Sequence, residues 1–248
     1  MNAPPPSDRP TLSVVAPAFN EAGNVEALVL ETAAALEGWA FEILIVDDAS
    51  TDATPQALRA LKARVPQLRV LCHGRNAGQS RAIRTGAEAA RGGLLATLDG
   101  DGQNDPADLP RLVSEMMTAA PEAALGMVSG QRVKRRDPWW KRAASRAGNA
   151  LRRAVLRDGA SDTGCGIKVM RRDAFLALPY FDHMHRFLPA LFQRDGWAVI
   201  YCDVNHRARA TGRSKYTNIG RLAASVVDLT GVVWLIARAR RHDGVREL

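Results

Sequence analysis

The chain has 248 residues, 46% of them hydrophobic and 24% charged, which is the composition of a globular protein with one sizeable core. Its first ten residues, MNAPPPSDRP, are polar and contain no apolar run. This excludes a signal peptide or membrane anchor there, and we expect a disordered leader over 1–10. The three cysteines lie far apart without zinc-site spacing, which favours a reduced, cytoplasmic compartment.

The net charge of +8 is unevenly distributed along the chain. Residues 132–157 carry a net charge of +9 and residues 207–248 carry +6, which leaves −7 on the rest. A mildly acidic body with two basic segments indicates an anionic partner: a membrane surface, a nucleic acid or a phosphate-rich ligand. We do not expect nucleic acid, because its binders interleave basic residues with base-stacking aromatics, and aromatics make up only 6% of this chain.

Short apolar runs alternate with segments of helical periodicity from residue 12 to about residue 130. Near-continuous apolar strands in this alternation predict an α/β fold with a single mainly parallel sheet and helices on both faces. The expected strands are 12–16, 41–46, 68–72, 94–98, 123–130, 167–170 and 197–205. The expected helices are 20–36, 54–65, 78–91, 106–119, one from about 138, 184–193 and 217–241, with Asn20 capping the first and Asp105 the fourth.

Acidic side chains follow three of the expected strands. Glu21 comes just after the first strand, Asp47 and Asp48 after the second, and Asp99 and Asp101 after the fourth. In open α/β sheets, ligands bind beyond the carboxyl ends of the strands. The sequence therefore predicts a ligand site at this edge of the sheet.

Asp99 and Asp101 are one residue apart, so on an extended segment their side chains point the same way. Two converging carboxylates repel unless a cation or proton lies between them, and hard oxygen ligands select Mg²⁺ or Mn²⁺. Gly100 and Gly102 would leave room for a ligand near the backbone. The alternative is a strand–turn–helix junction whose acids are only solvated.

Six segments appear in order that together resemble the family 2 glycosyltransferases of the GT-A fold, and more narrowly their dolichol-phosphate mannosyltransferase-like branch. The resemblance covers residues 11 to about 220 and implies an inverting, metal-dependent transferase. It would move a sugar from a nucleoside diphosphate sugar (GDP-mannose or a UDP-sugar) to polyprenyl phosphate. The segments are APAFNE (16–21), VDDAST (46–51), LDGDGQNDP (98–106), DTGCGIKVMRRD (162–173), HRFLPAL (185–191) and RATGRSKY (209–216).

The resemblance also implies the roles of individual residues, with Phe19 standing where the family more often has Tyr. The metal, Mg²⁺ or Mn²⁺, would be held by Asp99, Asp101 and Gln103. The nucleotide sugar would be bound by Pro17, Phe19, Glu21, Val46, Asp48, Asp99, Gly100, Asp101, Gln103, Arg132, Arg209 and Lys215, and the acceptor phosphate by Arg186 and Arg213. The catalytic set is Asp101, Asp162, Arg132 and Lys215.

The role of Asp162 depends on the acceptor. If the acceptor is a sugar hydroxyl of a cell-envelope glycan, an inverting transfer needs a general base, and Asp162 is the candidate by position. If the acceptor is a lipid phosphate, that phosphate is already anionic and needs no base, and Asp162 would order the acceptor-site turn.

Three further polar residues keep two interpretations each. His185 is either part of the acceptor site with Arg186 or a helix cap with a salt bridge. His206, at a strand end, is a third metal ligand or a structural histidine. Gln79 opens a helix whose N–H groups point at phosphate or are simply capped.

The C-terminal segment 217–248 is expected to be an amphipathic membrane-associating helix with a basic tail, following a transferase domain over 11–216. Its apolar part, 222–237, has 16 residues and contains Asp228, which is too short to span a bilayer. We expect it to lie in the interface of an anionic membrane, at the cytoplasmic face of the inner membrane, together with the basic segment 132–157. The alternatives are packing on the domain, a homodimer contact or a separate small membrane protein.

A sugar-phosphate nucleotidyltransferase is the rival enzyme class with a nucleotide-binding α/β domain and Mg²⁺. Such an enzyme needs a glycine-rich, basic phosphate loop after its first strand. The corresponding segment here, AFNEAGN over 18–24, is acidic, which disfavours this class.

Overall fold

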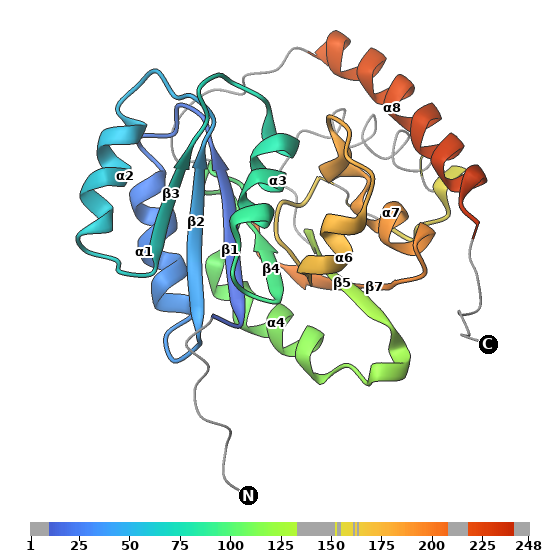
Figure 1. Ribbon diagram of the computed structural model, residues 1–248, viewed down its shortest axis with the longest axis horizontal. Coiled ribbons are helices and arrows are strands. Elements are labelled where there is room, and N and C mark those ends of the chain that lie inside the picture. Colours follow the sequence, from blue (N-terminus) through green and yellow to red (C-terminus); the bar gives the residue numbers. More distant parts are fainter. Residues whose placement is uncertain are drawn as a thin grey trace, which may run out of the picture.

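The computed structural model describes residues 10–132, 152, 155–160, 162, 164–207 and 218–240, the last range with side chains from residue 226 (Figure 1). Seven strands form one sheet in the order β3-β2-β1-β4-β6-β5-β7. Only β6 runs antiparallel to its neighbours, β4 and β5, so the predicted single, mainly parallel sheet is confirmed. The strands are β1 Leu12–Ala18, β2 Phe41–Asp47, β3 Leu68–Cys72, β4 Leu94–Thr97, β5 Leu125–Arg132, β6 Lys168–Arg171 and β7 Ala198–Val204.

Helices cover both faces of the sheet, as predicted (Figure 1). Alternate side chains of each strand enter different cores, because successive side chains of a strand point to opposite faces. Val14 joins a core with α1, α2 and α4, and Val15 joins a core with α3, α6 and α7. The helices are α1 Val25–Ala35, α2 Thr54–Lys62, α3 Gln79–Ala89, α4 Leu109–Thr118, α6 Arg172–Ala177, α7 Leu188–Arg194 and α8 Asn218–Arg238, with short 3-10 turns η1 Pro106–Asp108, η2 Pro121–Ala123 and η3 Met184–Arg186.

Two helix starts were predicted with named caps, and one of them is wrong. Asp105 accepts a hydrogen bond from the backbone N–H of Ala107 (3.1 Å), so this cap is confirmed, although the expected helix is divided into η1 and α4. Asn20 does not cap α1, which begins only after Asn24. Instead Asn20 has a left-handed backbone (φ 55°) and its side chain accepts from the N–H of Thr51 (2.7 Å), which ties the loop after β1 to the loop after β2.

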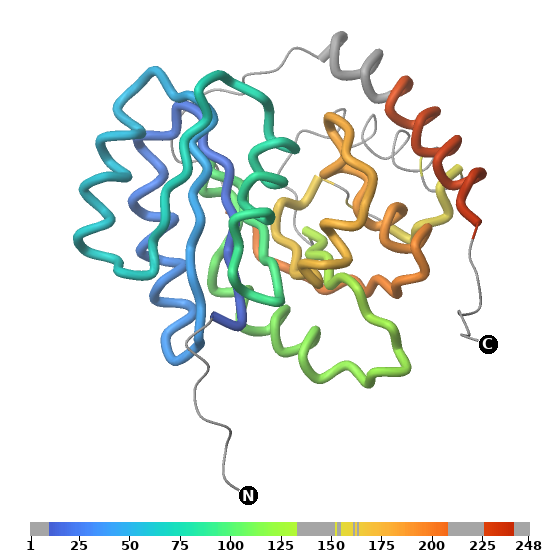
Figure 2. Tube along the Cα trace, viewed as in Figure 1, coloured from blue at the N-terminus to red at the C-terminus, as the bar shows by residue number. Residues whose placement is uncertain are grey.

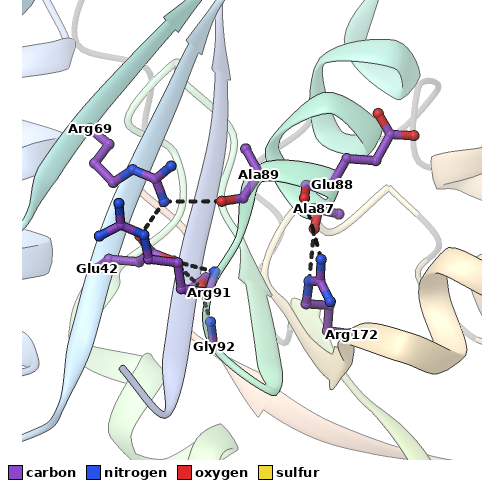
Figure 3. Close-up of polar contacts among 9 residues, drawn as sticks. Glu42, Arg69, Ala87, Glu88, Ala89, Arg91, Gly92 and Arg172 are labelled. Atoms are coloured by element: carbon purple, nitrogen blue, oxygen red, sulfur yellow. Dashed lines mark hydrogen bonds and ion pairs between the residues drawn. The ribbon is translucent and has the colours of Figure 1, made fainter. Parts of the chain in front are cut away.

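The amino-terminal end of the sheet is held by the buried carboxylate of Glu42 (Figure 3). It accepts hydrogen bonds from Ser13 Oγ (2.7 Å), Arg69 Nη1 (2.5 Å) and the N–H of Arg91 (2.6 Å). Burial alone would raise the pKa of this carboxyl, but these hydrogen bonds hold the pKa below its ordinary value. A network of this kind stabilises the end of the sheet opposite to the predicted ligand site.

α8 packs its inner face against α7 and leaves its outer face exposed. Val232 is fully buried, and the Nε of Arg194 donates to the carbonyl of Leu235 (3.1 Å). None of the helices in the described part of the chain combines the length and apolar character needed to cross a bilayer.

A helical glycine brings α3 into direct contact with β1. A Cβ added at Gly86 would lie 2.3 Å from Cγ1 of Val15, which is itself fully buried. We expect Gly86→Ala to lower the free energy of unfolding by roughly 1–3 kcal/mol through overpacking, measured by urea denaturation. Gly231→Ala in α8, where nothing lies within 4 Å, is the matched control and should stabilise by up to about 1 kcal/mol. A Gly86→Ala protein as stable as the native chain would contradict this packing.

Candidate active site

Asp99 and Asp101 lie at the carboxyl end of β4, in a loop folded around the buried side chain of Asn104. The Oδ1 of Asn104 accepts from the N–H of Asp99 (2.8 Å), and the Oδ1 of Asp101 accepts from the N–H of Gln103 (3.1 Å). From α3, Gln79 Nε2 donates to Asp99 Oδ1 (2.9 Å). The Asp99 carboxylate is therefore oriented by a residue far away in the sequence, and Gln79 is more than a helix opening.

Two glycines of the motifs have packing roles. A Cβ at Gly100 would lie 2.4 Å from the carbonyl oxygen of Pro17, so this glycine allows the loop to approach β1 closely. The sequence predicted that Gly100 leaves room for a ligand, but the space beside it is filled by the β1 backbone. A Cβ at Gly166 would lie 2.2 Å from Oδ2 of Asp99. The turn before β6 thus packs directly on the carboxylate, and Figure 2 shows the β4 and β6 segments side by side.

The electrostatics of Asp99 fit a cation site. Burial, and then the neighbouring charge of Asp101, raise the pKa of Asp99 from 3.8 to about 6, while Lys168 and Arg132 act in the opposite direction. Two carboxylates in this situation suit a divalent ion, which would remove their repulsion. No third His, Cys, Asp or Glu joins them within the residues that the structure describes. The backbone of His206 forms a β-bridge with Asn104, which places this residue beside the loop that carries Asp99.

Lys168 belongs to the site but was not singled out from the sequence. It lies on β6 opposite Thr97 of β4 and Ser129 of β5, is 3% exposed, and its Nζ donates to the carbonyl of Cys165. Burial lowers its pKa, while the charge of Asp99 acts to raise it. The signal in the sequence was a lysine inside the apolar strand IKVM, which is costly unless its charge is used.

Arg132 and Asp162 form a buried bidentate pair. Arg132 Nε donates to Asp162 Oδ2 (2.5 Å), and its Nη2 donates to Oδ1 (2.7 Å). The N–H of Gly164 also donates to Oδ1 (3.2 Å). Burial would lower the pKa of Arg132, but the bonds to Asp162 raise it. Arg132 is thus at the site, with its guanidinium bound to the neighbouring carboxylate.

Val46 and Asp48, which the resemblance places in the nucleotide-sugar site, also have structural roles. The side chain of Val46 is fully buried in the core. Asp48 is 3% exposed and accepts from the N–H groups of Ala77 and Gly78 (both 2.8 Å) and from His73 Nδ1 (2.7 Å). Its carboxylate therefore shapes the loop before α3.

Asp47 has a structural contact of its own, since its Oδ1 accepts from the N–H of Ser50 (3.0 Å). The sequence places Asp47 and Asp48 together at the end of the second strand. Both carboxylates are buried and hydrogen-bonded to the backbone, so both act in the loops at the carboxyl ends of β2 and β3.

The remaining predicted residues divide between the site edge and segments outside the described residues. Pro17 near the end of β1 and Phe19 and Glu21 just after it are half-buried, and Glu21 accepts from Asn24 Nδ2 (2.6 Å). Arg186 is half-buried in η3. Outside the described residues lie Arg209, Arg213 and Lys215, and all of the basic segment between 133 and 151 with Trp139 and Trp140.

His185 bonds to α3, where the sequence had allowed a helix cap with a salt bridge. Its Nδ1 lies 2.7 Å from the Oγ of Ser80, which is 1% exposed. Burial, and then the charges of Arg186 and Lys168, hold the pKa of His185 well below its ordinary value of 6.5, so the ring is neutral at neutral pH. Ser80 gave no signal in the sequence, because its partner is 105 residues away.

The raised pKa of Asp99 predicts a pH-dependent stability. The folded chain loses stability as pH rises from 3.8 through about 6, because ionising Asp99 is harder in the folded than in the unfolded state. In EDTA at pH 8, Asp99→Asn should therefore be more stable than the native chain by up to about 3 kcal/mol, with no difference below pH 4. Urea denaturation at both pH values measures this.

Asp173→Asn, at a side chain that is 94% exposed, is the control and should change stability equally at both pH values. Added Mg²⁺ should stabilise the native chain and not Asp99→Asn. A variant that is less stable than the native chain at pH 8 but not at pH 4 would contradict the electrostatic argument.

The chain has sequence relatives among transferases that act on polyprenyl phosphates. It is 36% identical over 231 residues to dodecaprenyl-phosphate galacturonate synthase of Rhizobium johnstonii, covering 91% of this chain and 67% of that protein. It is 37% identical over 225 residues to undecaprenyl-phosphate 4-deoxy-4-formamido-L-arabinose transferase of Pseudomonas aeruginosa, covering 88% and 63%. The chain thus spans about two thirds of the length of these relatives.

Solved structures share the fold. Glucosyl-3-phosphoglycerate synthase from Mycobacterium tuberculosis superposes with a TM-score of 0.69 at 19% identity, over 95% of this chain and 82% of that one. This structural similarity confirms the predicted GT-A fold. At 19% identity it supports a shared fold and nothing about function. The glycosyl transferase family 2 domain matches residues 13–178, about two thirds of the chain, and the chain belongs to glycosyl transferase family 2.

Proposed function

We propose that the chain is an inverting glycosyltransferase that moves a sugar from a nucleoside diphosphate sugar to polyprenyl phosphate at the cytoplasmic face of a membrane. Its family and its relatives named for dodecaprenyl and undecaprenyl phosphate support this proposal. So does the carboxylate-rich edge of the sheet, with Lys168 and Arg132 beside it.

The observation that favours a phosphate acceptor is the state of Asp162. Both of its oxygens accept charge-assisted hydrogen bonds from Arg132, and it is 7% exposed. A carboxylate bound in this way is stabilised in its ionised form and is a weak proton acceptor. A hydroxyl acceptor would need such a base, whereas a lipid phosphate would not.

The proposed transfer forms one bond to the anomeric carbon and breaks another, with no proton to remove. A phosphate oxygen of the acceptor attacks C1 of the sugar from the face opposite the diphosphate, and the nucleoside diphosphate leaves with the bonding electrons. In this proposal Arg186 and Arg213 bind the acceptor phosphate, and Lys168 and Arg132 provide positive charge near the leaving group. Arg209 and Lys215 would bind the donor diphosphate.

The metal is part of the proposal. Asp99 and Asp101 would hold Mg²⁺ or Mn²⁺, with Gln103 beside them, and the ion would neutralise charge on the leaving diphosphate when bound. The Mycobacterium tuberculosis synthase was crystallised with Mn²⁺ and UDP-glucose, which is consistent with a metal in this fold. The assignment here rests on the two adjacent carboxylates.

A screen of nucleotide sugars with Mg²⁺ or Mn²⁺ and a short polyprenyl phosphate tests the proposal. We expect the native chain to transfer sugar from one donor. The rate of this transfer should be at least about 100-fold lower in Asp99→Asn and in Asp101→Asn. Asp162→Asn should keep the rate on the lipid phosphate within about tenfold, because a lost general base would cost roughly 10²–10⁴-fold. Thermal unfolding of each variant controls for folding.

Two results would sink these assignments. Absence of both transfer and donor hydrolysis across the panel contradicts the transferase proposal. Transfer to a glycan hydroxyl that is abolished in Asp162→Asn would establish the alternative acceptor, with Asp162 as base.

We further propose that the outer face of α8 lies in the interface of an anionic membrane. Val227 is 69% exposed and Trp234 60%, and Arg238 follows Trp234 by one turn. Asp228, the acidic residue of the helix, does not belong to this outer face, since its carboxylate is bonded to His183 Nδ1 (3.0 Å). An apolar face bordered by tryptophan and arginine, with basic residues after it, suits a headgroup layer. A homodimer or a separate small membrane protein is the competing occupant.

Flotation of the full chain with vesicles containing phosphatidylglycerol tests this surface. Val227→Asp combined with Trp234→Asp should weaken binding at least about tenfold, through lost apolar burial and added negative charge. Met117→Asp, at a 54% exposed methionine on α4, is the matched control and should bind nearly as well as the native chain. If the α8 variant still binds vesicles but changes from dimer to monomer in sedimentation, α8 is a protein interface instead.

A further inference from the structure

The first turn of α3 connects two parts of the site through neighbouring side chains. Gln79 donates to Asp99 (2.9 Å), on the proposed donor side. Ser80, the next residue, bonds to His185 of η3 (2.7 Å), beside Arg186 on the proposed acceptor side. One helix start therefore touches both halves of the proposed reaction.

The helix that carries this turn is fixed at both ends. At its start, the carboxylate of Asp48 holds the N–H groups before Gln79. At its end, Arg69 donates to the carbonyl of Ala89 (3.0 Å) and Arg172 donates to that of Ala87 (3.0 Å), as Figure 3 shows. The first turn is thus a rigid support and not a fraying end.

The bond between Ser80 and His185 also bears on the tautomer of the ring. Ser80 Oγ lies 2.7 Å from Nδ1 and also accepts a longer hydrogen bond from the backbone N–H of His185 (3.4 Å), an arrangement that suits donation of the hydroxyl hydrogen to Nδ1. Because the ring is neutral, an Nδ1 that accepts leaves the hydrogen on Nε2. His185 then has one N–H to offer, in surroundings made positive by Arg186 and Lys168.

We propose that Ser80 is a positioning residue for the acceptor. By fixing the His185 ring in the tautomer that carries hydrogen on Nε2, it holds His185 and Arg186 in place as a pair of donors for an acceptor phosphate. This inference rests on the proposed function and adds one residue, Ser80, that neither the family motifs nor the strand-end acids had indicated.

The fold of η3 does not depend on this bond. Met184 (1% exposed) and Phe187 (4% exposed) anchor the turn in the core on either side of His185 and Arg186. Loss of the Ser80 hydroxyl should therefore change how His185 and Arg186 are held, more than whether the turn forms.

Steady-state kinetics of the full chain with a short polyprenyl phosphate test the proposal. Ser80→Ala should raise the KM for this acceptor about tenfold, leaving the KM for the donor and the rate of donor hydrolysis by water within about twofold. Ser80→Thr, which keeps the hydroxyl, should restore most of the loss. The matched control is Thr85→Val on the same helix, which removes a hydroxyl bonded to another histidine, His73 (3.0 Å), and should leave the acceptor KM unchanged.

A second measurement does not need the acceptor. Nitrogen-15 NMR of the imidazoles, with His185 assigned from the spectrum of His185→Gln, should show hydrogen on Nε2 in the native chain and a mixture of tautomers in Ser80→Ala. Only five histidines have to be resolved. An unchanged tautomer, or donor and acceptor KM values that rise together, would overturn the inference.

Failure of the proposed function is distinguishable from failure of the inference. If the native chain transfers only to a hydroxyl or not at all, the function is wrong, and the acceptor-phosphate role of Ser80 falls with it. If the native chain uses lipid phosphate and Ser80→Ala has a native acceptor KM, the function stands and the inference alone is wrong.

Discussion

The position of the Asp99 carboxylate is the constraint on which the site depends. It lies where β4, the last strand of the parallel half of the sheet, meets the antiparallel β6. Gln79 from α3, Asn104 from the following loop and the turn at Gly166 all contact the Asp99 residue, so three segments hold it in place before any ligand arrives. Groups fixed in this way need little reorganisation when charge develops, which is where most electrostatic stabilisation of a transition state originates.

Around Asp99, both a negatively charged group and a positively charged group lack full stabilisation. The carboxyl group has a raised pKa because it is buried beside Asp101, and the ammonium of Lys168 has a lowered pKa because it is buried as well. The Asp99 carboxylate and the Lys168 ammonium therefore each lack part of the solvation that water would provide. A metal-bound diphosphate carries a cation for the carboxylates and phosphate oxygens for Lys168 and Arg132, so one ligand relieves both deficits. A neutral ligand would relieve neither, and this is the physical basis for preferring a nucleoside diphosphate sugar.

Sequence reasoning predicted the parts of the molecule that follow from local pattern. The apolar runs gave the strands, and the acids after β4 were expected at the carboxyl edge because parallel strands must end there. The contacts that complete the site join residues far apart in the chain: Ser80 with His185, and Gln79 with Asp99. No periodicity records such pairs, since each member by itself is an ordinary helix-start or turn residue. A motif also indicates which residues lie near a site and not which groups they bond: the motif places Asp48 near the nucleotide sugar, and only the structure shows its carboxylate bonded to the backbone before α3.

The pairing of Arg132 with Asp162 links the choice of acceptor to the stability of the site. A buried guanidinium without its carboxylate is costly, so Asp162 cannot take up a proton without leaving the charge of Arg132 uncompensated. An acceptor that arrives already ionised avoids this conflict, because Asp162 can remain an anion throughout the reaction. A hydroxyl acceptor would require Asp162 to take up a proton in every catalytic cycle and so weaken its pairing with Arg132. The Arg132–Asp162 pair therefore supports the proposed acceptor, which supplies its own negative charge.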